Sequence, residues 1–160
     1  MARMEPLAAD GVPEAARESG FFRTLARAPR LTETAIAHSD AVMSEGRLPQ
    51  RLKELCAILI SALNQCEYCL SARRAEAERI GVEPQVLQDL HDYARSDKYS
   101  AGEKAALSAA IALTREPRAL PDTIWTELRA HYDEEEIVEL LAVIGLFNYF
   151  NRLNNALQIT

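Results

Sequence analysis

Apolar residues recur every three or four positions along most of the chain, which is the spacing of amphipathic helices. After Pro49, for example, Leu52, Leu55, Leu59 and Leu63 are spaced to share one side of a helix. No segment shows the alternation of apolar and polar residues that a half-buried strand requires. We therefore expect an all-α protein.

Proline, glycine and capping residues divide the chain into about eight helical segments. The connections are short, which favours antiparallel neighbours. We therefore expect a single-domain antiparallel helical bundle over residues 13–160, preceded by an N-terminal tail over residues 1–12. The predicted helical segments are residues 13–28, 29–46, 49–63, 65–80, 84–94, 100–113, 121–128 and 133–157.

Two of these segments, Cys56–Leu63 and Ile137–Phe150, are apolar around most of their circumference. A two-layer helical monomer seldom has room to bury two such helices completely. We therefore expect subunits to share the burial in a homo-oligomer.

Composition excludes several classes of partner. The 160 residues carry 24 acidic and 18 basic side chains, a net charge of −6, which argues against binding nucleic acid. The longest apolar stretch contains Glu139 and Asn148 and is too short to span a membrane. Three cysteines are too few for a secreted disulfide scaffold, and the N-terminus does not resemble a signal peptide. We expect a cytoplasmic protein with no membrane or nucleic-acid partner.

Cys66 and Cys69 form a C-x-x-C pair, which is the main chemical motif in the chain. Three residues apart in the first turn of a helix, the two sulfurs lie on nearly one face and can close a disulfide. A zinc site is hard to build, since Cys56 is the one further thiol and no histidine lies within twenty residues. By itself the pair fits redox chemistry about as well as structural packing or metal binding.

The position of the pair favours redox chemistry. Asn64 is a suitable N-cap, and Glu67 follows at capping-box spacing, which predicts that Cys66 occupies the second helical position. Free N–H groups there lower the pKa of a thiol. Arg73, four residues after Cys69 on the same helical face, would favour the thiolate further.

Two other titratable side chains have competing interpretations. Glu54, twelve residues before Cys66, is either a partly desolvated proton shuttle or a solvated residue in an early helical turn, and the solvated reading is the simpler one. His38 shares a face with Ala35 and Val42, so we expect it to point inward, more as a core residue than as a catalytic one.

The remaining polar residues on apolar faces have structural interpretations. Cys56 lies in the apolar stripe and is expected to be a small buried hydrophobe. Asn148, Asn151 and Asn155 share one face of the last helix, where they favour interhelical or intersubunit hydrogen bonds.

Taken together, these residues resemble a known family. Glu54, the pair Cys66–Cys69 twelve residues later and the closing segment Asn148–Leu157 resemble the alkylhydroperoxidase D-like, or carboxymuconolactone decarboxylase, superfamily. The resemblance covers roughly residues 20–158. It implies an all-helical subunit that assembles as a homo-oligomer, commonly a trimer or hexamer.

The resemblance also implies roles for the residues. Cys69 would attack a hydroperoxide, Cys66 would resolve the sulfenic acid into a disulfide, and Glu54 would belong to the proton relay. No metal or bound prosthetic group is implied. An external dithiol, on a lipoyl-bearing or thioredoxin-like reductant protein, would reduce the disulfide.

One position departs from the family pattern. Peroxidase members have a histidine where this chain has Arg73, and arginine cannot accept a proton at neutral pH. Arg73 can still hold a thiolate or an anionic substrate, and Tyr68, between the cysteines, can donate a hydrogen bond. We expect thiol–disulfide chemistry to survive better than efficient peroxidase turnover.

Three hypotheses follow. The first is a thiol-dependent oxidoreductase that reduces hydroperoxides or exchanges disulfides through Cys66 and Cys69. The second is a helical oligomer that has lost catalysis and serves as a binding module. The third is a lyase of the carboxymuconolactone decarboxylase type, with Arg73 holding a carboxylate, although such a reaction does not need a cysteine pair.

Overall fold

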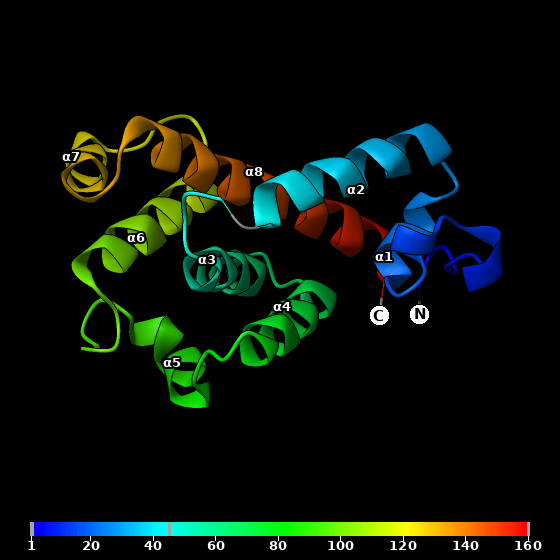
Figure 1. Ribbon diagram of the computed structural model, residues 1–160, viewed down its shortest axis with the longest axis horizontal. Helices are drawn as coiled ribbons and strands as arrows, with labels where there is room; N and C mark the ends of the chain where they lie inside the picture. Colours follow the sequence, from blue (N-terminus) through cyan, green and yellow to red (C-terminus); the bar gives the residue numbers. More distant parts are fainter. Residues whose placement is uncertain (1, 45, 160) are drawn as a thin grey trace.

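The computed structural model describes residues 2–44 and 46–159, and within them the chain forms eight α-helices and three short 3₁₀ turns (Figure 1). This confirms the all-α class and the number of helices. The helices are α1 (Gly20–Leu25), α2 (Pro29–Met43), α3 (Gln50–Leu63), α4 (Glu67–Arg79), α5 (Pro84–Asp89), α6 (Ala101–Arg115), α7 (Asp122–His131) and α8 (Glu134–Leu157).

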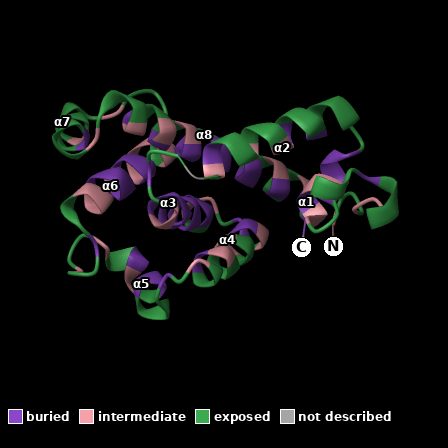
Figure 2. Cartoon of the chain, in the orientation of Figure 1, coloured by how far each residue is buried: buried purple, intermediate pink, exposed green. Residues whose placement is uncertain are grey.

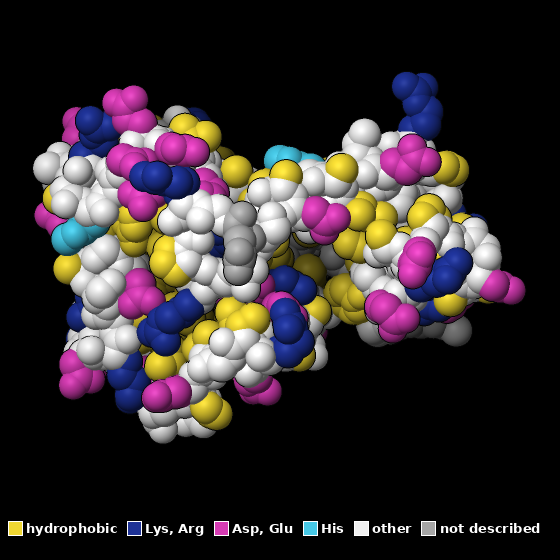
Figure 3. All heavy atoms as spheres, in the orientation of Figure 1, with side chains coloured by type: hydrophobic (Ala, Val, Ile, Leu, Met, Phe, Trp, Pro, Cys, Tyr) yellow, Lys and Arg dark blue, Asp and Glu magenta, His cyan; other side chains and the backbone are white. Residues whose placement is uncertain are grey.

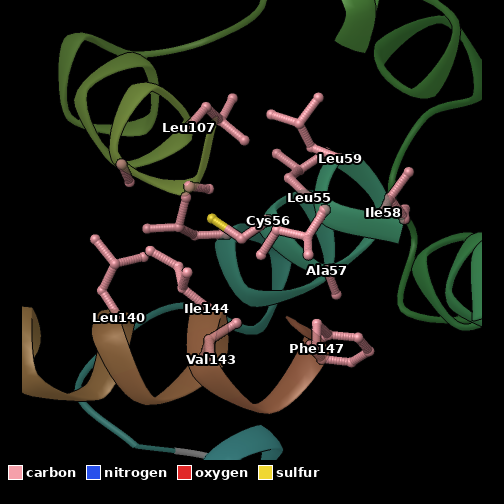
Figure 4. Close-up of a cluster of buried hydrophobic side chains, with 14 of the residues drawn as sticks. Leu55, Cys56, Ala57, Ile58, Leu59, Leu107, Leu140, Val143, Ile144 and Phe147 are labelled. Atoms are coloured by element: carbon pink, nitrogen blue, oxygen red, sulfur yellow. The ribbon is translucent and has the colours of Figure 1, made fainter. Parts of the chain in front are cut away.

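Helix α3 lies at the centre and packs mainly against α4, α6 and α8. Every residue from Leu52 to Ser61 is buried, as the continuous purple of α3 in Figure 2 shows. Cys56 lies among aliphatic side chains of α6 and α8, including Leu107 and Leu140, as Figure 4 shows. The prediction that Cys56 is a buried hydrophobe is confirmed, and burial raises its pKa to about 12.

The burial of Leu52–Ser61 in α3 corrects one sequence argument. A single chain buries this stretch, because α4, α6 and α8 pack around it, so these residues need no second subunit. Helix α8 differs, since Val138, Leu141 and Tyr149 are exposed on its outer face. Assembly into a trimer or hexamer stays a prediction that concerns α8 and not α3.

The ends of the helices follow local sequence signals in most places. Capping boxes begin α6 at Ser100 and α8 at Asp133, the residues at which the sequence predicts these two helical segments to start. The helix predicted over residues 13–28 is wrong in part. Residues Glu14–Ala16 form a 3₁₀ turn, and Ser19 starts α1 anew by accepting a hydrogen bond from the Phe22 amide.

The first twelve residues, expected as a tail, contact the helical body over part of their length. The Arg3 amide donates to the carbonyl of Leu157, which brings the two termini side by side (Figure 1). Val12 is buried in a small cluster with Ala16 and Ala26. On the face drawn in Figure 3, acidic and basic side chains are interspersed, without the single basic stripe typical of nucleic-acid sites.

One network fixes the loop between α2 and α3. The Lys53 side chain is fully buried, and its ammonium group donates to the carbonyls of Val42 and Ser44 and pairs with Glu139 of α8. Glu139 also accepts from the amide of Arg47, at 2.9 Å. Ser44 and Arg47 of the loop are thereby connected to both α3 and α8.

Candidate active site

The cysteine pair lies at the turn between α3 and α4, and this turn differs from the prediction. Asn64 ends α3 and does not cap α4, Gln65 adopts a left-handed conformation with φ 54°, and Cys66 itself is the N-cap. The expected capping box is therefore wrong. The side-chain amide of Asn64 instead turns toward α8, where its Nδ2 donates to Asn148 and Asn151 at 3.1 and 3.0 Å.

Both thiols of the pair are free and buried, with Cys66 1% and Cys69 6% exposed. The Cys69 thiol donates a hydrogen bond to Cys66, which lowers the pKa of Cys66 to about 7 and raises that of Cys69. Asn151 of α8 contributes a hydrogen bond that favours a negative charge on the pair. The pair as a whole therefore loses its first proton more readily than an isolated thiol does, and its second proton less readily.

A cavity of about 270 Å³ opens next to the pair, and Cys69 is the cysteine that lines it. The wall is formed by residues of α1, α2, α4 and α8 together with the segment before α1. They are Glu18, Ser19, Phe21, Phe22, Ser39, Tyr68, Cys69, Ala72, Arg73, Phe147, Phe150 and Asn154. The more acidic sulfur, Cys66, and the sulfur that faces the cavity, Cys69, are therefore different atoms.

Glu54 of α3 and Arg73 of α4 form an ion pair, with Arg73 Nη1 donating to Glu54 Oε1 at 3.1 Å. The solvated reading of Glu54 is wrong, because the residue is 5% exposed. Burial raises its pKa from 4.5 to about 7, although Arg73 acts in the opposite direction. The other oxygen, Oε2, is buried and has no hydrogen-bond partner among the described residues.

Arg73 has a second contact on the cavity side. Its guanidinium carbon lies 5.9 Å from the centre of the Phe147 ring, within the range of a cation–π interaction. It also lowers the pKa of Cys69 through its charge, although other effects outweigh this one. The expected closeness of Arg73 to the second cysteine is confirmed, and Glu54 adds an anchor on the opposite side.

Residues 29–112, more than half of the chain, match the Carboxymuconolactone decarboxylase family. A relative, the uncharacterized protein YdfG of Bacillus subtilis (strain 168), is 35% identical over 106 residues, which cover 66% of this chain and 72% of YdfG. The chain belongs to the carboxymuconolactone decarboxylase family. Another relative, the uncharacterized YnjA of Escherichia coli (strain K12), is 33% identical over 109 residues, 68% of this chain but 59% of YnjA.

Several solved structures have the same fold as this chain. The debrominase Bmp8, crystallised with 2,3,4-tribromopyrrole, gives a TM-score of 0.89 at 24% identity over 98% of this chain and 90% of Bmp8. An uncharacterized peroxidase-related protein of Ralstonia eutropha JMP134, described as an alkylhydroperoxidase AhpD core, gives 0.85 at 22% identity, covering 99% and 91%. A protein of unknown function from Agrobacterium tumefaciens, whose name associates it with AhpD-type antioxidant defence, gives 0.79 at 28% identity, covering 85% and 94%.

Of the other two supporting residues of this family member, Tyr68 lines the cavity and His38 does not. The Tyr68 hydroxyl accepts a hydrogen bond from the Phe21 amide at 3.2 Å and contacts Ser19 Oγ at 3.3 Å, so it ties α4 to α1. His38 is exposed, and the inward orientation is wrong. The buried face of α2 runs through Ala35 and Val42, and it is Ser39 that lines the cavity.

The asparagines of α8 were predicted to make interhelical hydrogen bonds, and this is confirmed within the chain. Asn151 donates to Ser61 Oγ at 3.2 Å, and Asn155 donates to the Asn64 carbonyl at 2.7 Å. Asn154 and the phenylalanines of the cavity were not predicted as site residues. The spacing of Phe147, Phe150 and Asn154, which is i, i+3 and i+7, is the signal that places them on one face.

Among the described residues, no cluster of three or more histidine, cysteine or acidic side chains is arranged to hold a metal ion. No helix in the same part of the chain is long and apolar enough to cross a membrane.

Proposed function

We propose that the chain is a thiol-dependent oxidoreductase that reduces hydroperoxides through Cys66 and Cys69. The observation that carries this proposal is the pair of free, buried thiols at the start of α4 with one member, Cys69, on the wall of a cavity. Membership of a family that includes peroxidase-related structural relatives supports it.

The reaction has two steps on the protein. Cys69 sulfur attacks the outer oxygen of the hydroperoxide, the O–O bond breaks, and the products are a Cys69 sulfenic acid and an alcohol. Cys66 then attacks the sulfenic sulfur and releases water, which leaves a Cys66–Cys69 disulfide. The peroxide has taken two electrons from the dithiol. A dithiol on a lipoyl-bearing or thioredoxin-like protein would return them by exchange with the disulfide.

Activation of Cys69 needs a group that takes its proton. Arg73 cannot do this, because a guanidinium stays protonated at neutral pH. We assign the task to Cys66, whose thiolate already accepts the hydrogen bond from the Cys69 thiol. Arg73 would stabilise the developing Cys69 thiolate by its charge, and Glu54, whose pKa is about 7, would supply the proton that the alkoxide product needs.

Thiol counting under denaturing conditions tests the proposal. One equivalent of cumene hydroperoxide should lower the count from three to one in the parent protein. Cys69→Ser should consume no peroxide, and Cys66→Ser should accumulate a sulfenic acid that dimedone traps. Cys56→Ala is the matched control and should lose both remaining thiols. Peroxide consumption by Cys69→Ser at the parent rate would reject the role of Cys69. Three thiols that stay reduced in the parent protein would reject the proposal and favour the binding-module hypothesis.

A second reaction of the same thiol pair is reductive dehalogenation of an aromatic ring. The likeness to Bmp8 concerns the fold, and what favours this reaction is the aromatic wall beside Cys69. Replacement of a carbon–bromine bond by a carbon–hydrogen bond consumes two electrons and a proton and releases bromide. Oxidation of the dithiol to a disulfide supplies the two electrons and the proton. Bromide release from a bromopyrrole together with loss of two thiols would establish this reaction. It would be excluded if peroxide oxidised the two thiols and the bromopyrrole neither oxidised them nor released bromide.

A further inference from the structure

The cavity beside Cys69 is built to hold an aromatic body. Phe21, Phe22 and Phe150 contact one another with ring centres 5.0 to 5.8 Å apart, and Phe147 extends this wall along α8. Apolar cavities of about 150 Å³ already bind benzene, and this cavity measures about 270 Å³. A substituted benzene ring therefore fits, whereas hydrogen peroxide would leave most of the aromatic wall uncovered.

Asn154 supplies a polar group on this wall. Its side chain lines the cavity and is 3% exposed, and its Nδ2 donates to the carbonyl of Phe150 at 3.0 Å. This bond fixes the orientation of the amide, because a flipped amide would place two acceptors against each other. Oδ1 is then directed away from the helix backbone.

Asn154 Oδ1 is buried and has no hydrogen-bond partner among the described residues. Buried acceptors without a partner are uncommon because desolvation is unfavourable. Of the other polar groups on the wall, Tyr68 and Ser19 bond to each other, Arg73 bonds to Glu54, and the rest are more exposed to water. Asn154 Oδ1 is thus the buried acceptor of the wall that no described residue satisfies.

We propose that the cavity binds the aromatic body of the substrate and that Asn154 Oδ1 accepts a hydrogen bond from its O–H or N–H group. This rests on the proposed function and names its substrate class, which is aryl-substituted hydroperoxides in preference to hydrogen peroxide. Cys69 and Asn154 line the same cavity, so the hydrogen bond would hold the hydroxyl end of the substrate on the side of the reactive sulfur.

Binding of unreactive analogues tests the proposal without turnover. The probes are cumyl alcohol, which has the aromatic body and a hydroxyl donor, and cumyl methyl ether, which keeps the oxygen but lacks the donor. Isothermal titration with the reduced full-length protein should show the alcohol binding about five- to tenfold more tightly than the ether. Asn154→Leu should remove this preference, and the exposed amide change Gln85→Leu should preserve it.

Each outcome separates this proposal from the proposed function. Equal binding of alcohol and ether to the parent protein would overturn the role of Asn154, and would do so even if Asn154→Leu failed to fold. A preference that persists in folded Asn154→Leu would overturn it as well. Tight, donor-dependent binding in a protein whose thiols ignore hydroperoxide would support the binding site and reject the peroxidase function.

Discussion

Glu54 makes the stability of the fold depend on pH, and replacing it by glutamine should remove that dependence. In the unfolded chain the carboxyl group ionises near pH 4.5, whereas burial holds its proton in the folded chain until about pH 7. Stability is therefore lost as pH rises from about 4.5 to 7, and the loss is constant above that range. One pKa unit corresponds to about 1.4 kcal/mol, so the total is about 3 kcal/mol of unfolding free energy.

Urea unfolding of the parent and of Glu54→Gln between pH 4.5 and 8.5 measures this effect. Glutamine has the same size and can still accept from Arg73, and all other titrating groups are shared by the two proteins. The variant should match the parent near pH 4.5 and be more stable by about 3 kcal/mol at pH 8. The exposed Glu78→Gln is the control and should stay within about 0.5 kcal/mol of the parent at every pH. A difference for Glu54→Gln that does not change with pH would refute a buried, proton-binding Glu54.

Three further substitutions probe the framework and the relay. Lys53→Met leaves Glu139 and two carbonyls without their buried partner. It should lower the free energy of unfolding, measured with urea, by about 3–5 kcal/mol. Adding Glu139→Leu should recover part of this loss. Tyr68→Phe removes the hydrogen bonds to Ser19 and the α1 backbone and should cost about 1 kcal/mol, with thiol oxidation still complete. Arg73→His should raise the rate of hydroperoxide consumption, measured at pH 7.5, because histidine adds a second base beside Cys69. An unchanged rate would mean that a base at this position does not limit the reaction.

Helix positions could be predicted because the apolar spacing and the caps are local signals. Ser100 and Asp133 begin helices where their own neighbours in sequence predict it. The turn before Cys66 could not be predicted in the same way, because Asn64 fits two roles equally well in sequence. Its contacts with Asn148 and Asn151, more than eighty residues later, select one of them.

The candidate site shows the same division. The spacing of Cys66 and Cys69 identified the pair, since three residues in a helical turn suffice to bring two sulfurs together. The burial of Glu54 depends on which helices cover α3, and a single turn of sequence does not contain that information. His38 was predicted to point inward, but the next residue, Ser39, lies on the inward face of α2 and lines the cavity.

The role inferred for Arg73 changes once its ion pair with Glu54 is known. In sequence, the family resemblance implies a proton-accepting histidine where this chain has the fixed cation of Arg73, and this suggests a loss. In the fold it balances Glu54, a carboxyl group that burial keeps partly protonated near neutral pH, and its charge favours the Cys69 thiolate. Within the candidate site, the groups whose pKa lies near 7 are then Glu54 and Cys66 of the thiol pair. On the proposed function, such a site depends on Cys66 for its base, so mutation of Cys66 should slow the first step as well as the second, unlike a site with a histidine relay.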